Sequence, residues 1–287
     1  MIIQLKGLSY VYNPGTPFEK KALDDISLDI DEGEFIGLIG HTGSGKSTLV
    51  QHLNGLMKPT AGEIIIDGQS LSDKTTKMKK IRQKVGLVFQ YPEHQLFEET
   101  IYKDIAFGPK NLGLSEEEID SRVKRAMELV GLDFEELKER SPFELSGGQK
   151  RRVAIAGVIA MKPKVLILDE PTAGLDPQGR DEILDEIKKL YEKENITTIL
   201  VSHSMEDIAR LVNRTIVMHK GKIAMDGTTR EVFSRSEELE KMGLGIPQIT
   251  QFMKKFKEKG HIVREDVLTI DEAKDVILEY LRRKDNA

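Results

Sequence analysis

Residues 40–47 read Gly-His-Thr-Gly-Ser-Gly-Lys-Ser and carry the clearest chemical pattern in the chain. The run matches G-x-x-x-x-G-K-[ST], in which glycines let backbone amides wrap closely around phosphate groups. Lys46 is expected to reach the β- and γ-phosphates of a nucleotide, and Ser47 to bind Mg²⁺. A chance glycine turn is the alternative, but a buried strand before it and a helix after it favour phosphate binding. The residues predicted to bind nucleotide here are Gly40, Thr42, Gly43, Ser44, Gly45, Lys46, Ser47 and Thr48.

Two adjacent carboxylates, Asp169 and Glu170, directly follow the apolar run of residues 165–168. Ligands bind beyond the carboxyl ends of buried parallel strands, so both acids should face a site. We expect Asp169 to hold Mg²⁺, directly or through water, and Glu170 to deprotonate a water that attacks the γ-phosphate. A merely solvated acid pair is the alternative, and the phosphate loop in the same chain argues against it.

A third pattern, Leu-Ser-Gly-Gly-Gln at residues 145–149, opens a predicted helix that runs to about Met161. Ser146 is a good N-cap, and two glycines after it allow an anion to approach the helix N-terminus closely. A plain glycine-capped helix start is the alternative interpretation. The residues predicted to contact nucleotide here are Ser146, Gly147, Gly148 and Gln149.

The elements that must position these residues follow an α/β pattern. Residues 35–39, 165–168 and 197–201 are continuous apolar runs, typical of strands covered on both faces. An amphipathic helix separates the last two runs, with Ile183 and Ile187 on its apolar face. Strand, helix, strand predicts a parallel sheet with right-handed crossovers. The middle of the chain reads as helical, beginning with a capping box at Ser115 and Glu118.

Composition narrows the class of protein. The 287 residues carry 43 Lys and Arg against 48 Asp and Glu, a net charge of −5, which argues against a general nucleic-acid binder. Six basic residues within residues 74–84 are interpreted as a solvated helix face, with anionic lipid as the lesser alternative. The absence of cysteine excludes disulfides and thiolate metal sites. No apolar run approaches the ~18 residues that span a bilayer, and no signal peptide is recognised, so we expect a cytosolic protein.

The three motifs together resemble those of the ATP-binding-cassette ATPases, over residues 1 to about 233. The resemblance implies a RecA-like parallel-sheet core, an antiparallel β subdomain and a helical subdomain at about residues 92–162. It also implies a head-to-tail dimer. In that dimer ATP lies between the phosphate loop of one subunit and the helix start at Ser146 of the other, with Mg²⁺ bound.

The same resemblance assigns four further residues. Tyr12 looks like the aromatic residue that stacks on adenine, with Tyr10 as the competing choice. Gln90 looks like the Q-loop glutamine that senses Mg²⁺ and the attacking water. Asp176 lies in the D-loop, which crosses to a second subunit, and His203 looks like the switch histidine that contacts the γ-phosphate.

A finer resemblance is to the ATPases of energy-coupling-factor transporters, and especially to the second ATPase of their vitamin-type group. It rests on residues 90–97, 100–108 and 243–248. It implies an importer of vitamins or transition-metal ions that contains a second cassette ATPase, as a homodimer or heterodimer. The other implied partners are a transmembrane coupling protein and a membrane-embedded substrate-binding protein. The chain would be peripheral on the cytoplasmic face of the membrane. The alternatives are the ATPase of an ordinary importer and a soluble cassette ATPase of DNA repair or translation.

Residues 234–287 are expected to form a small helical module with a dimerisation role, because their apolar set is larger than a solvated extension needs. That set includes Ile246, Ile249, Phe252 and Phe256.

Within residues 91–107 we expect Leu96 and Phe97 to face the membrane partner. Ile101 and Phe107 are instead expected to pack inside the helical subdomain. The role of His94 stays open.

Overall fold

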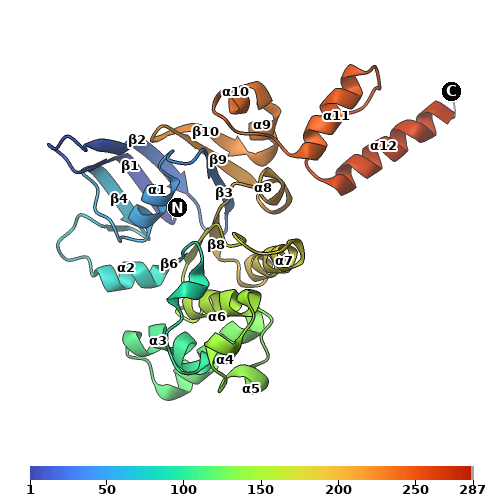
Figure 1. The fold of residues 1–287 in the computed structure, drawn as a ribbon. Coiled ribbons are helices and arrows are strands. Elements are labelled where there is room, and N and C mark those ends of the chain that lie inside the picture. Colours follow the sequence, from blue (N-terminus) through green and yellow to red (C-terminus); the bar gives the residue numbers. More distant parts are fainter. Residues whose placement is uncertain (286–287) are drawn as a thin grey trace.

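The computed structural model describes residues 1–285, which form two sheets, a group of helices below them and a helical tail (Figure 1). The larger sheet has the order β10-β9-β3-β8-β7-β6, and the smaller, antiparallel sheet has the order β2-β1-β4-β5. The large-sheet strands are β3 (Phe35–Gly40), β6 (Val85–Val88), β7 (Val165–Asp169), β8 (Thr197–Val201), β9 (Arg214–His219) and β10 (Lys222–Thr228). The small-sheet strands are β1 (Ile3–Tyr12), β2 (Lys20–Ile30), β4 (Ala61–Ile66) and β5 (Gln69–Ser70).

The large sheet is parallel from β9 to β6, and β10 is its antiparallel edge. Every residue of β3, β6, β7 and β8 is buried, as expected for strands covered on both faces. One face packs on the small sheet and α1 (Lys46–Leu53), and the other packs on helices. The parallel α/β core and the antiparallel subdomain are therefore confirmed. The carboxyl ends of β3, β6, β7 and β8 meet at one edge, where the predicted motifs begin.

The helical subdomain lies below the large sheet in Figure 1. It contains a short 3₁₀ turn at Pro92–Gln95, α3 (Ile101–Leu112), α4 (Glu116–Leu129), α5 (Phe134–Leu137), a second 3₁₀ turn at Pro142–Glu144 and α6 (Gly147–Ile159). Ile119, Val123 and Met127 of α4 are buried at the predicted helical spacing. Their burial joins this subdomain to the same apolar core that covers the large sheet.

The remaining helices outside the tail flank the sheets. They are α2 (Met78–Lys84), α7 (Pro177–Glu194), α8 (Met205–Leu211) and α9 (Thr229–Ser234). Helix α7 lies between β7 and β8 in sequence and buries Ile183 and Ile187, so the predicted crossover is confirmed. None of the helices within residues 1–285 is long and apolar enough to cross a membrane.

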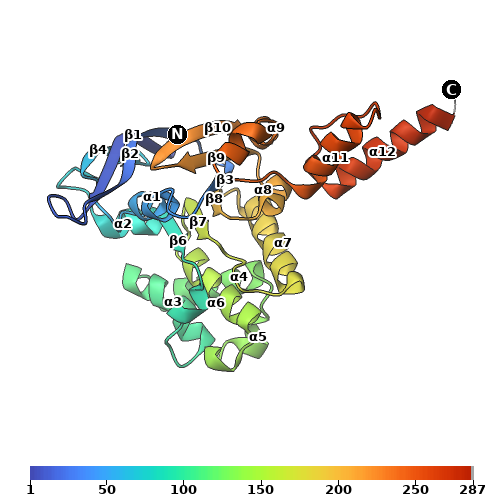
Figure 2. The ribbon, with the colours of Figure 1, turned by 45° about the horizontal axis from the view of Figure 1, so that its top comes forward.

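The tail divides into two parts. Its first helix, α10 (Ser236–Lys241), and the segment after it place Leu239 and Leu244 in the main core. The second part contains α11 (Gln248–Glu258) and α12 (Ile270–Asp285) and has a small core of its own around Met253 and Val267. In both views α12 points away from the body (Figures 1 and 2). The tail therefore packs partly on the main core, through α10 and Leu268, and partly on its own small core. Residues 286–287 of the expected module lie outside the described residues.

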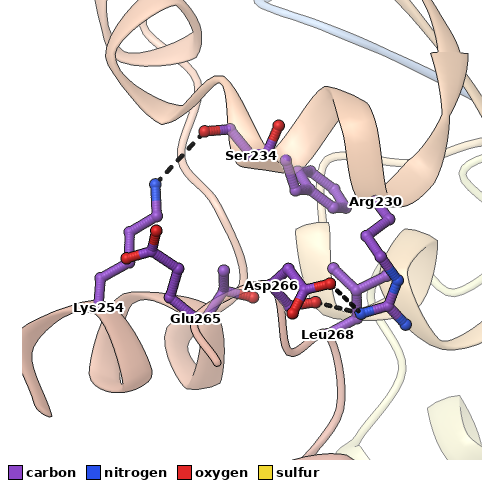
Figure 3. A pocket seen from close by; sticks show the side chains of 8 residues that line it. Arg230, Ser234, Lys254, Glu265, Asp266 and Leu268 are labelled. Carbon is purple, nitrogen blue, oxygen red and sulfur yellow. Dashed lines mark hydrogen bonds and ion pairs between the residues drawn. The ribbon is translucent and has the colours of Figure 1, made fainter. Parts of the chain in front are cut away.

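Polar contacts attach the second part of the tail to α9 and α10 around a cavity of about 110 Å³ (Figure 3). Arg230 bonds to Asp266 and to Glu272, with a 2.9 Å contact to the Glu272 carboxylate. Lys254 donates to the Ser236 hydroxyl at 2.6 Å. On the other side, the Gln248 amide donates to Glu206 of α8 at 3.2 Å. These contacts are mostly solvent-accessible, so we expect them to orient the tail more than to stabilise it.

Candidate nucleotide site

A pocket of about 380 Å³ opens at the carboxyl edge of the large sheet and gathers most of the predicted site. The predicted residues that line it are Tyr12, Thr42, Gly43, Gly45, Lys46, Ser47, Thr48, Gln90, Glu170 and His203. Gly40 lies at the end of β3 beneath the loop, and Ser44 is buried and lines a neighbouring hollow beside His41. Residues from five separate stretches of the sequence therefore converge on one cavity.

The phosphate loop depends on glycine at its turn into α1. Gly45 is the N-cap of α1 and has a φ of 107°, in the left-handed region that side chains rarely adopt. A Cβ at Gly45 would also lie 2.6 Å from the carbonyl oxygen of Ala22. The loop therefore closes tightly, and its amides surround the start of α1.

Lys46 lies buried within this loop. Its Nζ donates to the carbonyl oxygens of Gly40, at 2.6 Å, and His41, at 3.4 Å. Burial lowers the pKa of Lys46, and the nearby carboxylates of Glu170 and Asp169 oppose that shift. A cation held on neutral carbonyls is ready to exchange them for phosphate oxygens, which bind it more strongly.

Asp169 ends β7 and is buried behind the pocket wall. Burial raises its pKa, and the neighbouring Glu170 carboxylate raises it further. The nearby Lys46, His203 and Ser47 lower the same pKa in part. An incompletely compensated carboxylate beside a hydroxyl is an oxygen donor set that suits a hard divalent cation such as Mg²⁺. Within residues 1–285 no cluster of three or more His, Cys, Asp or Glu side chains forms a separate metal site.

Glu170 joins the ends of three strands. Its Oε2 accepts a hydrogen bond of 2.7 Å from Nε2 of Gln90, which follows β6, and its Oε1 lies 2.7 Å from Nε2 of His203, which follows β8. The backbone φ of Glu170 is 50°, a left-handed conformation that costs about 1 kcal/mol or more for a residue with a side chain. The two side-chain contacts hold the carboxylate at the pocket, where a general base would act.

The structure separates Tyr12 from its competitor Tyr10. Tyr12 lines the pocket, and its hydroxyl lies 3.2 Å from Oγ1 of Thr48. Tyr10 instead packs edge-on against Tyr12 and His52, beside the core between the two sheets. Tyr12 is therefore the tyrosine available to a base.

The residues of the third motif lie elsewhere. Ser146 caps α6 and forms a complete capping box with Gln149. A Cβ added at Gly147 or Gly148 would meet no other atom within 4 Å. None of Ser146, Gly147, Gly148 and Gln149 lines the pocket of this chain. Asp176 is exposed and caps α7 by accepting from the Gly179 amide at 2.8 Å. The start of α6 thus lies outside the pocket, with open space beside its two glycines.

Comparison with known proteins agrees with this geometry. Residues 23–173 match the ABC transporter family. The energy-coupling factor transporter ATP-binding protein EcfA2 of Clostridium tetani is 63% identical over 284 residues, which cover 99% of both chains. This chain belongs to the ABC transporter family and, within it, to the energy-coupling factor ATP-binding proteins. It is an ATPase of the cassette type, as the sequence motifs predicted.

Two solved structures are similar in fold. The first is cbiO1 from Clostridium perfringens, described as part of the ABC transporter complex cbiONQ. It has a TM-score of 0.74 and 40% identity, with coverage of 88% of this chain and 98% of that one. The second is the cassette MJ0796 in a dimeric post-hydrolysis state with ADP and Pi. It has a TM-score of 0.70 and 31% identity, with coverage of 79% and 99%. The cassette fold is therefore confirmed.

The predicted partner-facing residues need a correction. Leu96 is only 9% exposed and packs in the main core, so the prediction that it faces a partner is wrong. Phe97 is 58% exposed and meets Phe107 edge-to-face at 5.0 Å. Phe107 is itself 46% exposed, which overturns its assignment to the core, whereas Ile101 is buried as expected. The exposed apolar pair is Phe97 and Phe107.

Sequence reasoning missed two residues of the pocket, Lys20 and Ala22. Lys20 begins β2 and pairs directly with Tyr12 across the β1–β2 ladder. A hairpin predicted after Tyr12 would have placed Lys20 beside the pocket. The register of the β1–β2 ladder, however, contains irregularities that no spacing rule predicts. Arg151 and Glu93, which contact each other behind the site, were also not recognised.

We expect Tyr12→Ala to weaken ATP binding about tenfold, because stacking on a base contributes ~1–3 kcal/mol. Tyr12→Phe should retain most of the affinity, since it keeps the ring and loses only the hydroxyl contacts to Thr48 and Met57. Tyr10→Phe is the control and should bind ATP within about twofold of the natural chain. Equal losses for Tyr12→Ala and Tyr10→Phe in a calorimetric titration would contradict the assignment.

We expect Glu170→Gln to bind ATP normally but to hydrolyse it at least ~100-fold more slowly, because the amide cannot accept a proton from water. Lys46→Ala should instead weaken nucleotide binding, since it removes a charge from the phosphates. Binding and turnover are measured separately, by titration with ATP and by phosphate release. Near-normal turnover in Glu170→Gln would remove Glu170 from the role of general base.

Proposed function

We propose that the chain is the ATPase subunit that drives an importer of vitamins or transition-metal ions. The observation that carries the proposal is the site itself: a phosphate loop, a Gln90–Glu170–His203 cluster and an open α6 start on one chain. Its kinship with energy-coupling factor ATPases supplies the class of transporter. The alternative of an ordinary importer loses support from that kinship, and the alternative of DNA repair or translation loses support from the same relatives.

The proposed reaction uses the residues in separate roles. Tyr12 stacks on adenine, and Lys46 and the loop amides bind the phosphates. Ser47 and Asp169, with Gln90 nearby, would hold Mg²⁺, which supplies charge neutralisation of the phosphates when bound. Glu170 takes a proton from the attacking water, and His203 orients the Glu170 carboxylate and lies within reach of the γ-phosphate.

A second cassette is proposed to complete the site. The start of α6 does not reach the pocket of its own chain, so the second set of anion contacts has to come from a partner subunit. Asp176, exposed at the start of α7, is proposed to lie at the same interface. The partner is a second cassette ATPase, of the same or a related chain, and no nucleic acid is involved.

The membrane partners are proposed to be a transmembrane coupling protein and a membrane-embedded substrate-binding protein, which would hold the chain on the cytoplasmic face. The exposed Phe97–Phe107 pair is the proposed docking surface for the coupling protein. Two acidic residues near this pair already have partners within the chain. Glu93 pairs with Arg151, and Asp104 accepts from the amides of Phe97 and Glu98. Apolar contact therefore carries this proposal.

We expect the double variant Phe97→Ser, Phe107→Ser to bind ATP normally but to lose assembly with the coupling protein and transport. Phe143→Ser is the matched control, because Phe143 is 59% exposed in the same subdomain. Leu96→Ser should instead lower the melting temperature, since Leu96 is in the core. Co-purification from membranes and uptake into vesicles are the measurements. Normal assembly of the double variant would place docking elsewhere and contradict the proposal.

Residues 248–287 are proposed to hold two ATPase subunits together when the nucleotide site is open. Their small core leaves apolar side chains exposed on α11, on α12 and on the segment between them. The exposed side chains are Phe252, Ile262, Ile270, Leu278 and Leu281. An isolated two-helix unit with that much exposed apolar surface gains stability from a partner.

We expect a chain truncated after Pro247 to stay folded and bind ATP, but to dimerise more weakly without nucleotide. Sedimentation velocity at several concentrations is the measurement. A chain truncated after Arg235 should be unstable, because it also removes Leu239 and Leu244 from the main core at a cost of several kcal/mol. An unchanged monomer–dimer equilibrium after truncation at Pro247 would show that the tail has another role.

A further inference from the structure

Arg151 is a charged side chain that the reaction described above leaves without a role, although it is only 1% exposed. It lies on α6, five residues after Ser146. Its Nε and Nη2 donate to the two carboxylate oxygens of Glu93 at 3.1 and 2.7 Å. Its Nη1 donates to the carbonyl oxygens of Pro171 and Ala173, both at 2.9 Å. Four of the five guanidinium N–H groups are thus used in one fixed arrangement.

The partners of Arg151 lie directly beside the reacting groups. Glu93 is three residues after Gln90, and Pro171 follows Glu170. Gln90 and Glu170 are themselves joined by a 2.7 Å hydrogen bond. The guanidinium therefore connects, from behind, the two chain segments whose side chains meet in the pocket.

Both segments contain strained backbone. Glu170 has a φ of 50° and Tyr91, next to Gln90, has a φ of 55°. Such conformations persist in side-chain-bearing residues only where the surroundings hold them. The bonds of Arg151 to Pro171, Ala173 and Glu93 are contacts of that kind, and they fix each segment immediately after its left-handed residue.

The next residue of α6 shows what a structural ion pair looks like here. Arg152 pairs with Glu182 and Glu186 of α7 and so links two helices. It contacts neither segment of the site. Glu93 and Glu186 are matched in exposure, at 17% and 19% of their side chains. The two glutamates therefore match in exposure, but Arg151 is more buried than Arg152, at 1% against 17% of the side chain, and the two pairs differ in what they hold.

We propose that Arg151 is a positioning residue for hydrolysis. It holds the backbone segments that carry Gln90 and Glu170 in place and connects them to α6. When the start of α6 contacts the nucleotide of the opposite subunit, a movement of α6 is transmitted through this guanidinium to Glu170 of the same subunit. One subunit's engagement with the second nucleotide thereby prepares its own general base. The inference rests on ATP hydrolysis by the cassette and not on the identity of the membrane partners.

The test compares Glu93→Gln with Glu186→Gln in the purified full-length chain. No other ATPase is present there, so the measured hydrolysis takes place only at sites that contain Glu170. Glu93→Gln removes the charge that orients Arg151, so we expect kcat to fall about tenfold while the KM for ATP stays within twofold. The Hill coefficient for ATP should also fall toward one. Glu93→Asp keeps the charge but draws the carboxylate back, so its kcat should lie between the two.

Glu186→Gln should also lower the melting temperature, but by less than Glu93→Gln, because Arg152 is less buried and keeps its contact with Glu182. Its kcat should stay within twofold of the natural chain. Equal kcat losses in Glu93→Gln and Glu186→Gln would reduce Arg151 to a structural role and overturn the proposal. A raised KM with unchanged kcat in Glu93→Gln would overturn it as well. If Glu93→Gln does not fold, Glu93→Asp decides: a natural kcat and Hill coefficient in that variant would overturn the proposal. Loss of membrane assembly with this kinetic pattern intact would count against the importer function alone.

Discussion

The parallel pairing of β3, β8, β7 and β6 is the constraint on which the nucleotide site depends. Parallel strands end at the same edge of a sheet, so the groups that follow them meet there without long connections. Gln90 and His203 are 113 residues apart in the sequence. Their side chains nevertheless each lie 2.7 Å from the carboxylate of Glu170. A shift of one strand by a single residue would separate them.

Charge inside the site is balanced only in part by the protein. Lys46 is buried on neutral carbonyls, and Asp169 is buried beside a second carboxylate. Burying each charge destabilises the fold. Phosphates would compensate the charge of Lys46 and a divalent cation that of Asp169, because each supplies the missing opposite charge. This imbalance favours ligand binding by the same residues at a cost to folding.

The start of α6 lies outside the chain's own pocket, and we have proposed that it serves the nucleotide of a second subunit. Because α6 carries Arg151 a little further along, the proposed contact with another subunit's nucleotide and the proposed positioning of Glu170 would share this helix. The exposed Phe97–Phe107 pair belongs to the same helical subdomain, so force on it would reach the same helix.

The sequence by itself determined the chemistry of the site and the class of fold. A phosphate loop, a strand-end acid pair and a glycine-capped helix are local patterns, and each predicts its own geometry because backbone conformation and strand direction are local properties. Tertiary structure decided whatever depended on distant partners. It showed that Tyr12 and not Tyr10 lines the pocket, that Leu96 is buried while Phe107 is exposed, and that the tail packs partly on the main core and partly on its own small core. It also joined Arg151 to Glu93 across 58 residues. Whether an apolar or charged side chain faces outward is set by which elements pack on it, and no spacing within a single segment contains that information.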